Sequence, residues 1–135
     1  MCLLVLAWNS HPRYRLIVAA NRDEFHDRPT APLGWWPDDS RILAGRDLRG
    51  SGTWLGAARS GRFGVITNFR EFERPAADAP SRGDLVRRFL SEAISPQEYF
   101  DDLRDRAPSY AGFNLLLGGP RSLYYYSNRD GLEAR

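Results

Sequence analysis

Cys2 is the residue with the clearest chemical potential, because it is the only cysteine in the chain and directly follows Met1. A cysteine side chain is small, so we expect Met1 to be removed, which leaves Cys2 with both a thiol and a free α-amine. An α-amine has a pKa of about 7.7–8.0 and can act as the base for its own nucleophile, a recognised way to activate a terminal residue. The sequence contains no lysine, so this amine would be the only primary amine of the protein.

The residues near Cys2 depend on a predicted β-hairpin. Leu3–Trp8 predicts a buried strand, and residues 14–20 predict a second strand after a turn. If the loop occupies about residues 9–13, antiparallel pairing places Cys2 opposite Ala20 to Arg22. The polar run at residues 21–24 then lies next to the sulfur. The alternative is that Cys2 is only a small apolar residue in a buried strand, because cysteine is among the most often buried residue types.

The polar run Asn21-Arg22-Asp23-Glu24 supplies groups that could tune this thiol. On a strand, Asn21 and Asp23 face one way while Arg22 and Glu24 face the other. An arginine beside a thiol favours the thiolate, and a carboxylate can hold a charged amine in place. The alternative is a solvated strand end whose charges pair at the surface, where ion pairs are common and weak.

Three further groups are candidates for binding or catalysis. Asn68 ends a predicted strand, where its amide could stabilise an oxyanion or simply form a turn. Trp35 and Trp36 form an exposed-looking pair in a proline-rich stretch, residues 26–40, which predicts a long loop. These tryptophans could line an apolar pocket or pack back on the core. The two histidines, His11 and His26, have no second His or Cys at metal spacing, so we expect no metal site.

The composition is that of one globular domain: 135 residues, 42% hydrophobic and 27% charged. All 19 basic residues are arginine and acids are interleaved with them, so the net charge of +2 does not predict a nucleic-acid surface. We expect a cytoplasmic protein without a membrane span, because the apolar start is too short to cross a bilayer and lacks signal-peptide features. A single cysteine excludes an internal disulfide.

The elements that must position these residues follow an α+β order: five strands, two helices and two strands, with a mainly antiparallel sheet. The first helix is predicted to begin at Ser81, with Asp84 completing a capping box. The second is predicted from Ser95-Pro96, an N-cap followed by proline. After the first hairpin, the predicted strands span residues 42–47, 53–58, 62–68, 113–118 and 123–127.

The chain resembles the NRDE family, whose signature is the tetrapeptide at residues 21–24. The resemblance covers essentially the whole chain and also includes, in order, the start Met-Cys-Leu, Gly45-Arg46-Asp47 through Gly56, Thr67-Asn68-Phe69-Arg70 and Ser81-Arg82-Gly83-Asp84-Leu85. Members of this family are usually close to twice this length. We therefore expect residues 1–135 to be a single NRDE-type domain that represents its N-terminal half, with a sheet edge to be covered by a partner or a second copy.

The resemblance also implies a fold and a chemistry. The family looks related to N-terminal-nucleophile hydrolases, which have a four-layer αββα sandwich and cleave amide bonds by acyl transfer. On that relation Cys2 is the nucleophile, Asn68 is similar to an oxyanion-hole asparagine, and Asp23 resembles the aspartate that contacts the terminal amine. Arg22 matches less well, because the arginine of those hydrolases lies several residues before the aspartate.

Two function hypotheses follow. The first is an N-terminal-cysteine amidohydrolase that acts on a small acyl amide, with no cofactor. The second is a non-catalytic trafficking protein that handles haem or lipid on the same scaffold, with Cys2, His11 or His26 as an axial haem ligand.

Overall fold

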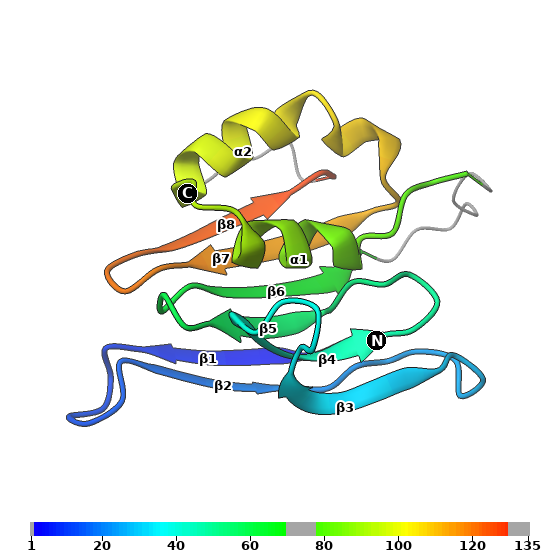
Figure 1. The fold of residues 1–135 in the computed structure, drawn as a ribbon. Coiled ribbons are helices and arrows are strands. Elements are labelled where there is room, and N and C mark those ends of the chain that lie inside the picture. Colours follow the sequence, from blue (N-terminus) through cyan, green and yellow to red (C-terminus); the bar gives the residue numbers. More distant parts are fainter. Residues whose placement is uncertain (1, 70–77, 130–135) are drawn as a thin grey trace.

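A computed structural model describes residues 2–69 and 78–129 of the chain. The predictions that concern the removal of Met1, the proline-rich loop around Pro75 and the polar end at residues 130–135 lie outside the described residues. The strands form two sheets, a two-stranded hairpin and a six-stranded antiparallel sheet in the order β3-β4-β5-β6-β7-β8 (Figure 1). The predicted α+β class is confirmed.

The six-stranded sheet contains the meander and the C-terminal hairpin that the turn spacing predicts. The helices intervene between its sixth and seventh strands, yet β6 and β7 pair directly along six residues, from Phe63 opposite Gly118 to Asn68 opposite Phe113. The strands of this sheet are β3 (Thr30–Trp35), β4 (Ile42–Asp47), β5 (Leu55–Ala58), β6 (Phe63–Asn68), β7 (Phe113–Gly118) and β8 (Leu123–Ser127).

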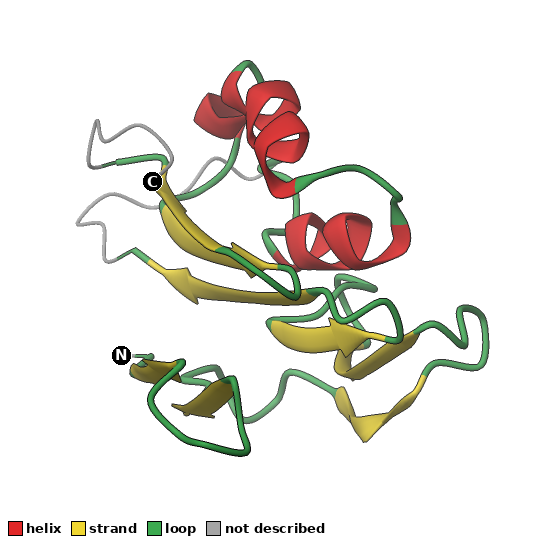
Figure 2. Ribbon diagram, turned by 90° about the vertical axis from the view of Figure 1, so that its left-hand side faces the viewer, coloured by secondary structure: helices red, strands yellow, loops and turns green. Residues whose placement is uncertain are grey.

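Both helices pack on one face of this sheet, and the N-terminal hairpin lies on the other (Figure 2). The core lies between the helices, α1 (Gly83–Ser91) and α2 (Pro96–Arg104), and the sheet, with a short 3₁₀ turn at Ala107–Ser109. Several of its aromatic pairs meet edge to face, as Phe89 and Tyr99 do at 5.5 Å between ring centroids. The fully buried core side chains include Leu85, Val86, Phe89, Tyr99, Leu103, Phe113, Leu115 and Leu117.

The two helices differ in how they begin. Ser95 caps α2 as predicted, and Glu98 completes a capping box with it. The capping box predicted at Ser81 is wrong, because α1 begins at Gly83 without a side-chain cap. A backbone contact fixes this start instead: the Thr53 N–H donates to the Gly83 carbonyl at 3.1 Å. A side chain at Gly52 would lie only 2.3 Å from the Gly83 carbonyl carbon, so this close approach requires glycine.

The long loop predicted over residues 26–40 is wrong, because it contains the edge strand β3. Its prolines conceal the strand in the sequence, but Pro32 lies at an irregularity of the pairing with β4, between Ala31 and Gly34. An edge strand tolerates proline at such a bulge because no ladder hydrogen bond is lost. Six strands therefore precede the helices, not five.

The N-terminal hairpin forms in the predicted register from β1 (Leu4–Trp8) and β2 (Leu16–Ala20). The prediction of a buried strand at residues 3–8 is wrong, since Leu3 and Val5 are 61% and 57% exposed. Only one face of the hairpin is turned toward the large sheet, so alternate side chains of β1 face outward. No helix within residues 2–69 and 78–129 is long and apolar enough to cross a membrane.

Candidate functional site

The hairpin register brings the polar run at residues 21–24 to the cysteine. The backbones of Asn21 and Leu3 extend the pairing, with the Asn21 N–H donating to the Leu3 carbonyl at 3.1 Å. The Asn21 side chain holds the same pairing in place, because its Oδ1 accepts a hydrogen bond from the Leu3 N–H at 2.8 Å. The Asp23 N–H then points to the Cys2 sulfur, with N and Sγ 3.4 Å apart. The proximity predicted from hairpin geometry is therefore observed.

A cluster of four charged side chains anchors this run to the large sheet. Asp47, the last residue of β4, accepts hydrogen bonds on Oδ2 from Arg28 Nε at 2.7 Å and from Arg22 Nη2 at 3.1 Å. Glu24 lies 3.6 Å from Arg22 and 3.7 Å from Arg28. Two cations thus face two carboxylates, and the Arg22 guanidinium also stacks over the Trp54 ring at 4.3 Å.

Asp47 is the centre of this cluster and is only 7% exposed. Its second oxygen, Oδ1, accepts the backbone N–H groups of Arg49 and Gly50, each at 2.9 Å. Burial raises the pKa of Asp47, but the Gly50 N–H, the Arg28 side chain and the Arg49 N–H outweigh it, so that the pKa lies below its ordinary value. Asp47 is therefore ionised at neutral pH and holds both arginines.

A large cavity of about 560 Å³ opens beside these residues. Its wall combines the polar run, the end of β6 and the start of α1, and it is rich in charge. The predicted site residues that line it are Cys2, Asn21, Arg22, Asp23, Glu24 and Asn68. Asn68 is exposed at the end of β6, and its amide makes no hydrogen bond to the residues that the structure describes.

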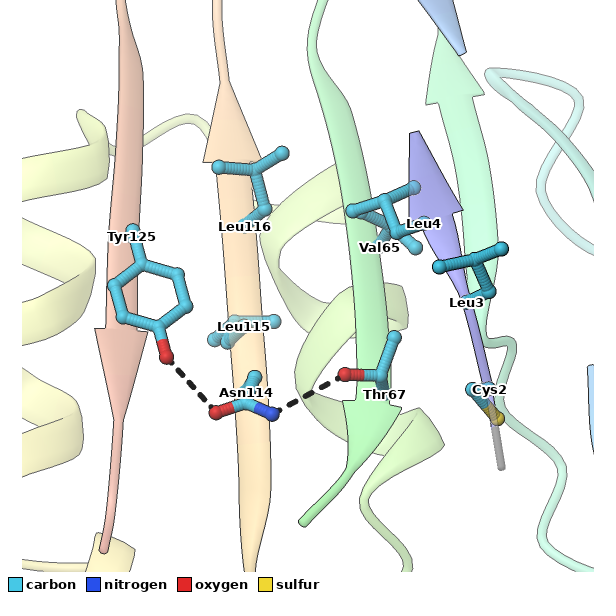
Figure 3. A pocket seen from close by; sticks show the side chains of 9 residues that line it. All are labelled: Cys2, Leu3, Leu4, Val65, Thr67, Asn114, Leu115, Leu116 and Tyr125. Carbon is cyan, nitrogen blue, oxygen red and sulfur yellow. Dashed lines mark hydrogen bonds between the residues drawn. The ribbon is translucent and has the colours of Figure 1, made fainter. Parts of the chain in front are cut away.

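A second cavity of about 250 Å³ lies between β1 and the face of the large sheet that the helices leave open (Figure 3). It also includes Cys2, so the sulfur lies where the two cavities meet. The other residues that line it are Leu3, Leu4, Val65, Thr67, Asn114, Leu115, Leu116 and Tyr125.

The remaining predicted residues lie elsewhere. Trp35 is 46% exposed beneath the Arg59 guanidinium, whereas Trp36 is only 4% exposed and donates to the Ala44 carbonyl at 3.2 Å. The prediction of an exposed tryptophan pair is therefore wrong for Trp36, because successive residues at the end of β3 face opposite ways. Neither tryptophan is among the residues that line the two cavities.

The histidines also lie outside the residues that line the candidate site. His11 stacks on Tyr14 in the exposed turn of the hairpin, and His26 is exposed in the loop before β3. Neither lines either cavity. In the part of the chain that the structure describes, no group of three or more His, Cys, Asp or Glu side chains is arranged to hold a metal ion.

Sequence reasoning missed two parts of this site. Asp47 was placed only in the stretch that begins Gly45-Arg46-Asp47, without a role of its own, although a lone acid at the end of an apolar strand marks a candidate polar site. The second part is a polar row from three strands, Thr67, Asn114 and Tyr125. Its only sequence signal is a polar residue inside an otherwise apolar stretch, as with Asn114 between Phe113 and Leu115.

Comparison with known proteins places the chain among relatives of about twice its length. Residues 1–134 match the family model described as Transport and Golgi organisation 2. A mouse Transport and Golgi organization 2 homolog is 35% identical over 145 residues, covering 98% of this chain and 52% of the mouse protein. The human homolog is 34% identical, covering 96% and 51%, and the Drosophila melanogaster protein is 31% identical, covering 86% and 45%. The chain thus spans about half the length of the curated relatives it matches.

Proposed function

The chain belongs to the Transport and Golgi organisation 2 family, and on this premise we propose that Cys2 is the nucleophile of an acyl-amide hydrolase site. The relatives carry names that refer to transport and Golgi organisation, and these names specify no reaction. The proposal therefore rests on the residues of this chain. It includes the expectation that the helices, the large sheet and the hairpin form part of an αββα sandwich of the N-terminal-nucleophile type.

The observation that supports the proposal most is the location of the Cys2 sulfur where two cavities of different character meet. The large cavity is lined by charged residues from the polar run and β4, including Arg22 and Asp47. Among the residues described, no charged side chain lines the small cavity. A substrate bound across the sulfur would therefore place its uncharged part in the small cavity and its polar part in the large cavity. The bond to be broken would then lie next to the sulfur, and this proximity favours attack.

The proposed reaction is acyl transfer in two steps. With Met1 removed, the α-amine of Cys2 takes the thiol proton through a water molecule, and the sulfur attacks the acyl carbon to form a tetrahedral oxyanion. The C–N bond breaks as the α-ammonium gives its proton to the departing amine, which leaves a thioester on Cys2. Water, deprotonated by the same amine, then hydrolyses the thioester to release the acid and restore the thiol.

Each predicted site residue has a role in this proposal. Asn68, whose exposed amide lines the large cavity, would donate a hydrogen bond to the oxyanion. The Asp23 carboxylate would hold the terminal amine, because its own backbone N–H already lies 3.4 Å from the sulfur. Arg22 and Glu24 act as positioning residues, since both belong to the charged cluster around Asp47. Asn21 fixes the register through Leu3.

Turnover of a panel of N-acyl amides by wild type, Cys2→Ser and Cys2→Ala tests the proposal. We expect wild type to release free acid and both variants to fall to the uncatalysed rate. Asn68→Ala should acylate Cys2 more slowly and leave the hairpin intact. Turnover by Cys2→Ala equal to that of wild type would overturn the assignment of Cys2 as the nucleophile.

A label specific for a 1,2-aminothiol, such as a cyanobenzothiazole, reports separately whether the N-terminus is Cys2. Labelling requires both the thiol and the free amine, and the chain has a single cysteine, so any label identifies this residue. Retention of Met1 in the purified protein would exclude the amine as the base.

A further inference from the structure

The small cavity beside Cys2 has two levels that the strand register fixes. Thr67 of β6 pairs with Asn114 of β7, and two residues along the same strands Val65 pairs with Leu116. Because alternate residues of a strand share a face, these four side chains point to the same side of the sheet, away from the helices (Figure 3). The wall therefore has one polar level and one apolar level.

Three side chains form a hydrogen-bonded row at the polar level. The Tyr125 hydroxyl donates to Asn114 Oδ1 at 2.9 Å, and Asn114 Nδ2 donates to Thr67 Oγ1 at 3.4 Å. Figure 3 shows this row running across β8, β7 and β6 toward Cys2, which lies at about the same level. The sulfur is thus in line with a set of oriented, uncharged polar groups.

The row retains hydrogen-bonding capacity for a ligand. A carboxamide has two N–H donors and two carbonyl lone pairs, and the contacts with Tyr125 and Thr67 use one of each on Asn114. The Asn114 side chain makes no other hydrogen bond within the described part of the chain. Its contact with Thr67 is long for a hydrogen bond, so a ligand oxygen can replace it at small cost.

We infer that the small cavity is the acyl-binding subsite of this enzyme, and that the Thr67–Asn114–Tyr125 row selects an uncharged acyl group that carries a hydroxyl or carbonyl oxygen. This inference rests on the proposed function, because it assigns a specificity to the same sulfur. A carboxylate or ammonium at the far end of the acyl chain is disfavoured, because the eight lining residues other than Cys2 have uncharged side chains and offer it no counter-charge.

The volume of the cavity corresponds to an acyl chain of medium length. At about 30 Å³ per water-sized group, 250 Å³ holds about eight non-hydrogen atoms. A hydroxyhexanoyl group is of this size. Its hydrocarbon part would contact Val65 and Leu116 while its hydroxyl reaches Asn114.

The test measures acylation of Cys2 by p-nitrophenyl esters that differ only in the acyl group: acetyl, hexanoyl, and hexanoyl with a hydroxyl on the third or the sixth carbon, positions from which the ester does not readily close to a lactone. In wild type we expect one hydroxyhexanoyl ester to react about tenfold faster than hexanoyl, which corresponds to one net hydrogen bond. Asn114→Leu should abolish or reverse that preference, and Thr67→Val and Tyr125→Phe should weaken it.

Two controls separate this inference from the proposed function. Tyr126 is the neighbouring residue of β8, and its ring stacks on Phe100 on the helix side of the sheet. Tyr126→Phe removes an equivalent hydroxyl there and should leave the preference for the hydroxyhexanoyl ester unchanged. The acetyl ester is too short to depend on the row, so it should acylate Cys2 equally in every variant. Equal rates with hexanoyl and both hydroxyhexanoyl esters in wild type, with acetyl transfer intact, would overturn the acyl subsite alone. Failure of every ester to acylate Cys2 would overturn the proposed function.

Discussion

The two faces of the six-stranded sheet differ in what covers them. On one face, α1 and α2 seal a core in which Phe89, Tyr99 and Leu115 are fully buried. On the other face, the β1–β2 hairpin leaves Thr67 and Asn114 half-buried and borders the small cavity, which meets the large one at Cys2. The same strands supply both faces, because alternate residues point in opposite directions.

This difference separates stability from chemistry within one sheet. Close packing of apolar side chains supplies most of the folding free energy, and it leaves no space for a ligand. A face that is only partly covered contributes less to stability, but it exposes oriented polar groups and the sulfur. Mutations on the two faces should therefore have separable effects.

The largest expected effect is on the helix face. Phe89→Ala removes a fully buried ring that packs edge to face with Tyr99, so we expect a loss of about 3–5 kcal/mol in the free energy of unfolding. Urea denaturation measures it. Under conditions where the variant stays folded, its Cys2 should be labelled by a thiol reagent at the wild-type rate. A parallel loss of labelling in the folded variant would show that the two faces are not independent.

The second effect concerns the charged cluster, which joins the hairpin to β4. Asp47→Asn removes the charge that holds Arg22 and Arg28, so we expect a loss of about 2 kcal/mol at neutral pH. The pKa of Asp47 lies below its ordinary value in the folded chain, so its contribution is complete above about pH 4 and is lost as the pH falls through the folded pKa.

Urea denaturation as a function of pH checks this second effect. The stability of wild type should fall more steeply on the acid side than that of Asp47→Asn. Asp101→Asn is the control, because it removes a pair with Arg104 in which both side chains are more than half exposed, and it should cost less than about 0.5 kcal/mol. Equal costs for the two variants would contradict the role of Asp47 as an anchor.

A smaller effect is expected at the start of α2. Ser95→Ala removes the cap that accepts the Glu98 N–H at 3.2 Å, at an expected cost of about 1 kcal/mol. Thermal denaturation should detect it. Because α2 lies on the helix face, the rate of Cys2 labelling should not change.

The smallest effect is expected on the outer face of the hairpin. Val5 is 57% exposed there, so Val5→Thr, which keeps the shape and the β-branch, should change stability by no more than about 0.5 kcal/mol. A loss above 2 kcal/mol by urea denaturation would show that this face is covered in solution.

Local patterns in the sequence predicted much of the fold. The two C-terminal strands and the capped second helix depend on turn formers and apolar spacing within a few residues, as at Ser95-Pro96, and they were confirmed. The edge strand β3 was missed because its prolines are typical of loops, and only pairing with β4 makes the strand visible. The start of α1 was missed because a contact with Thr53, distant in the sequence, determines it.

Some contacts of the candidate site could likewise be predicted from local sequence, and others could not. The proximity of residues 21–24 to Cys2 follows from the register of one hairpin, so the sequence alone could predict it. The link from Arg22 to Asp47 and the contact between Thr67 and Asn114 join residues that are 25 and 47 positions apart in the chain. No local pattern encodes such pairs, because the topology of the sheet brings them together.

The most direct test of the central claim, that the open face of the sheet carries a reactive N-terminal cysteine, is the intact mass of the protein after a brief exposure to an acyl donor. We expect a chain that begins at Cys2 and carries one acyl group, with fragmentation placing that group on Cys2 and with the adduct disappearing over time as water hydrolyses it. A chain that retains Met1, or one that carries no acyl group on Cys2 while the protein is folded, would contradict this claim.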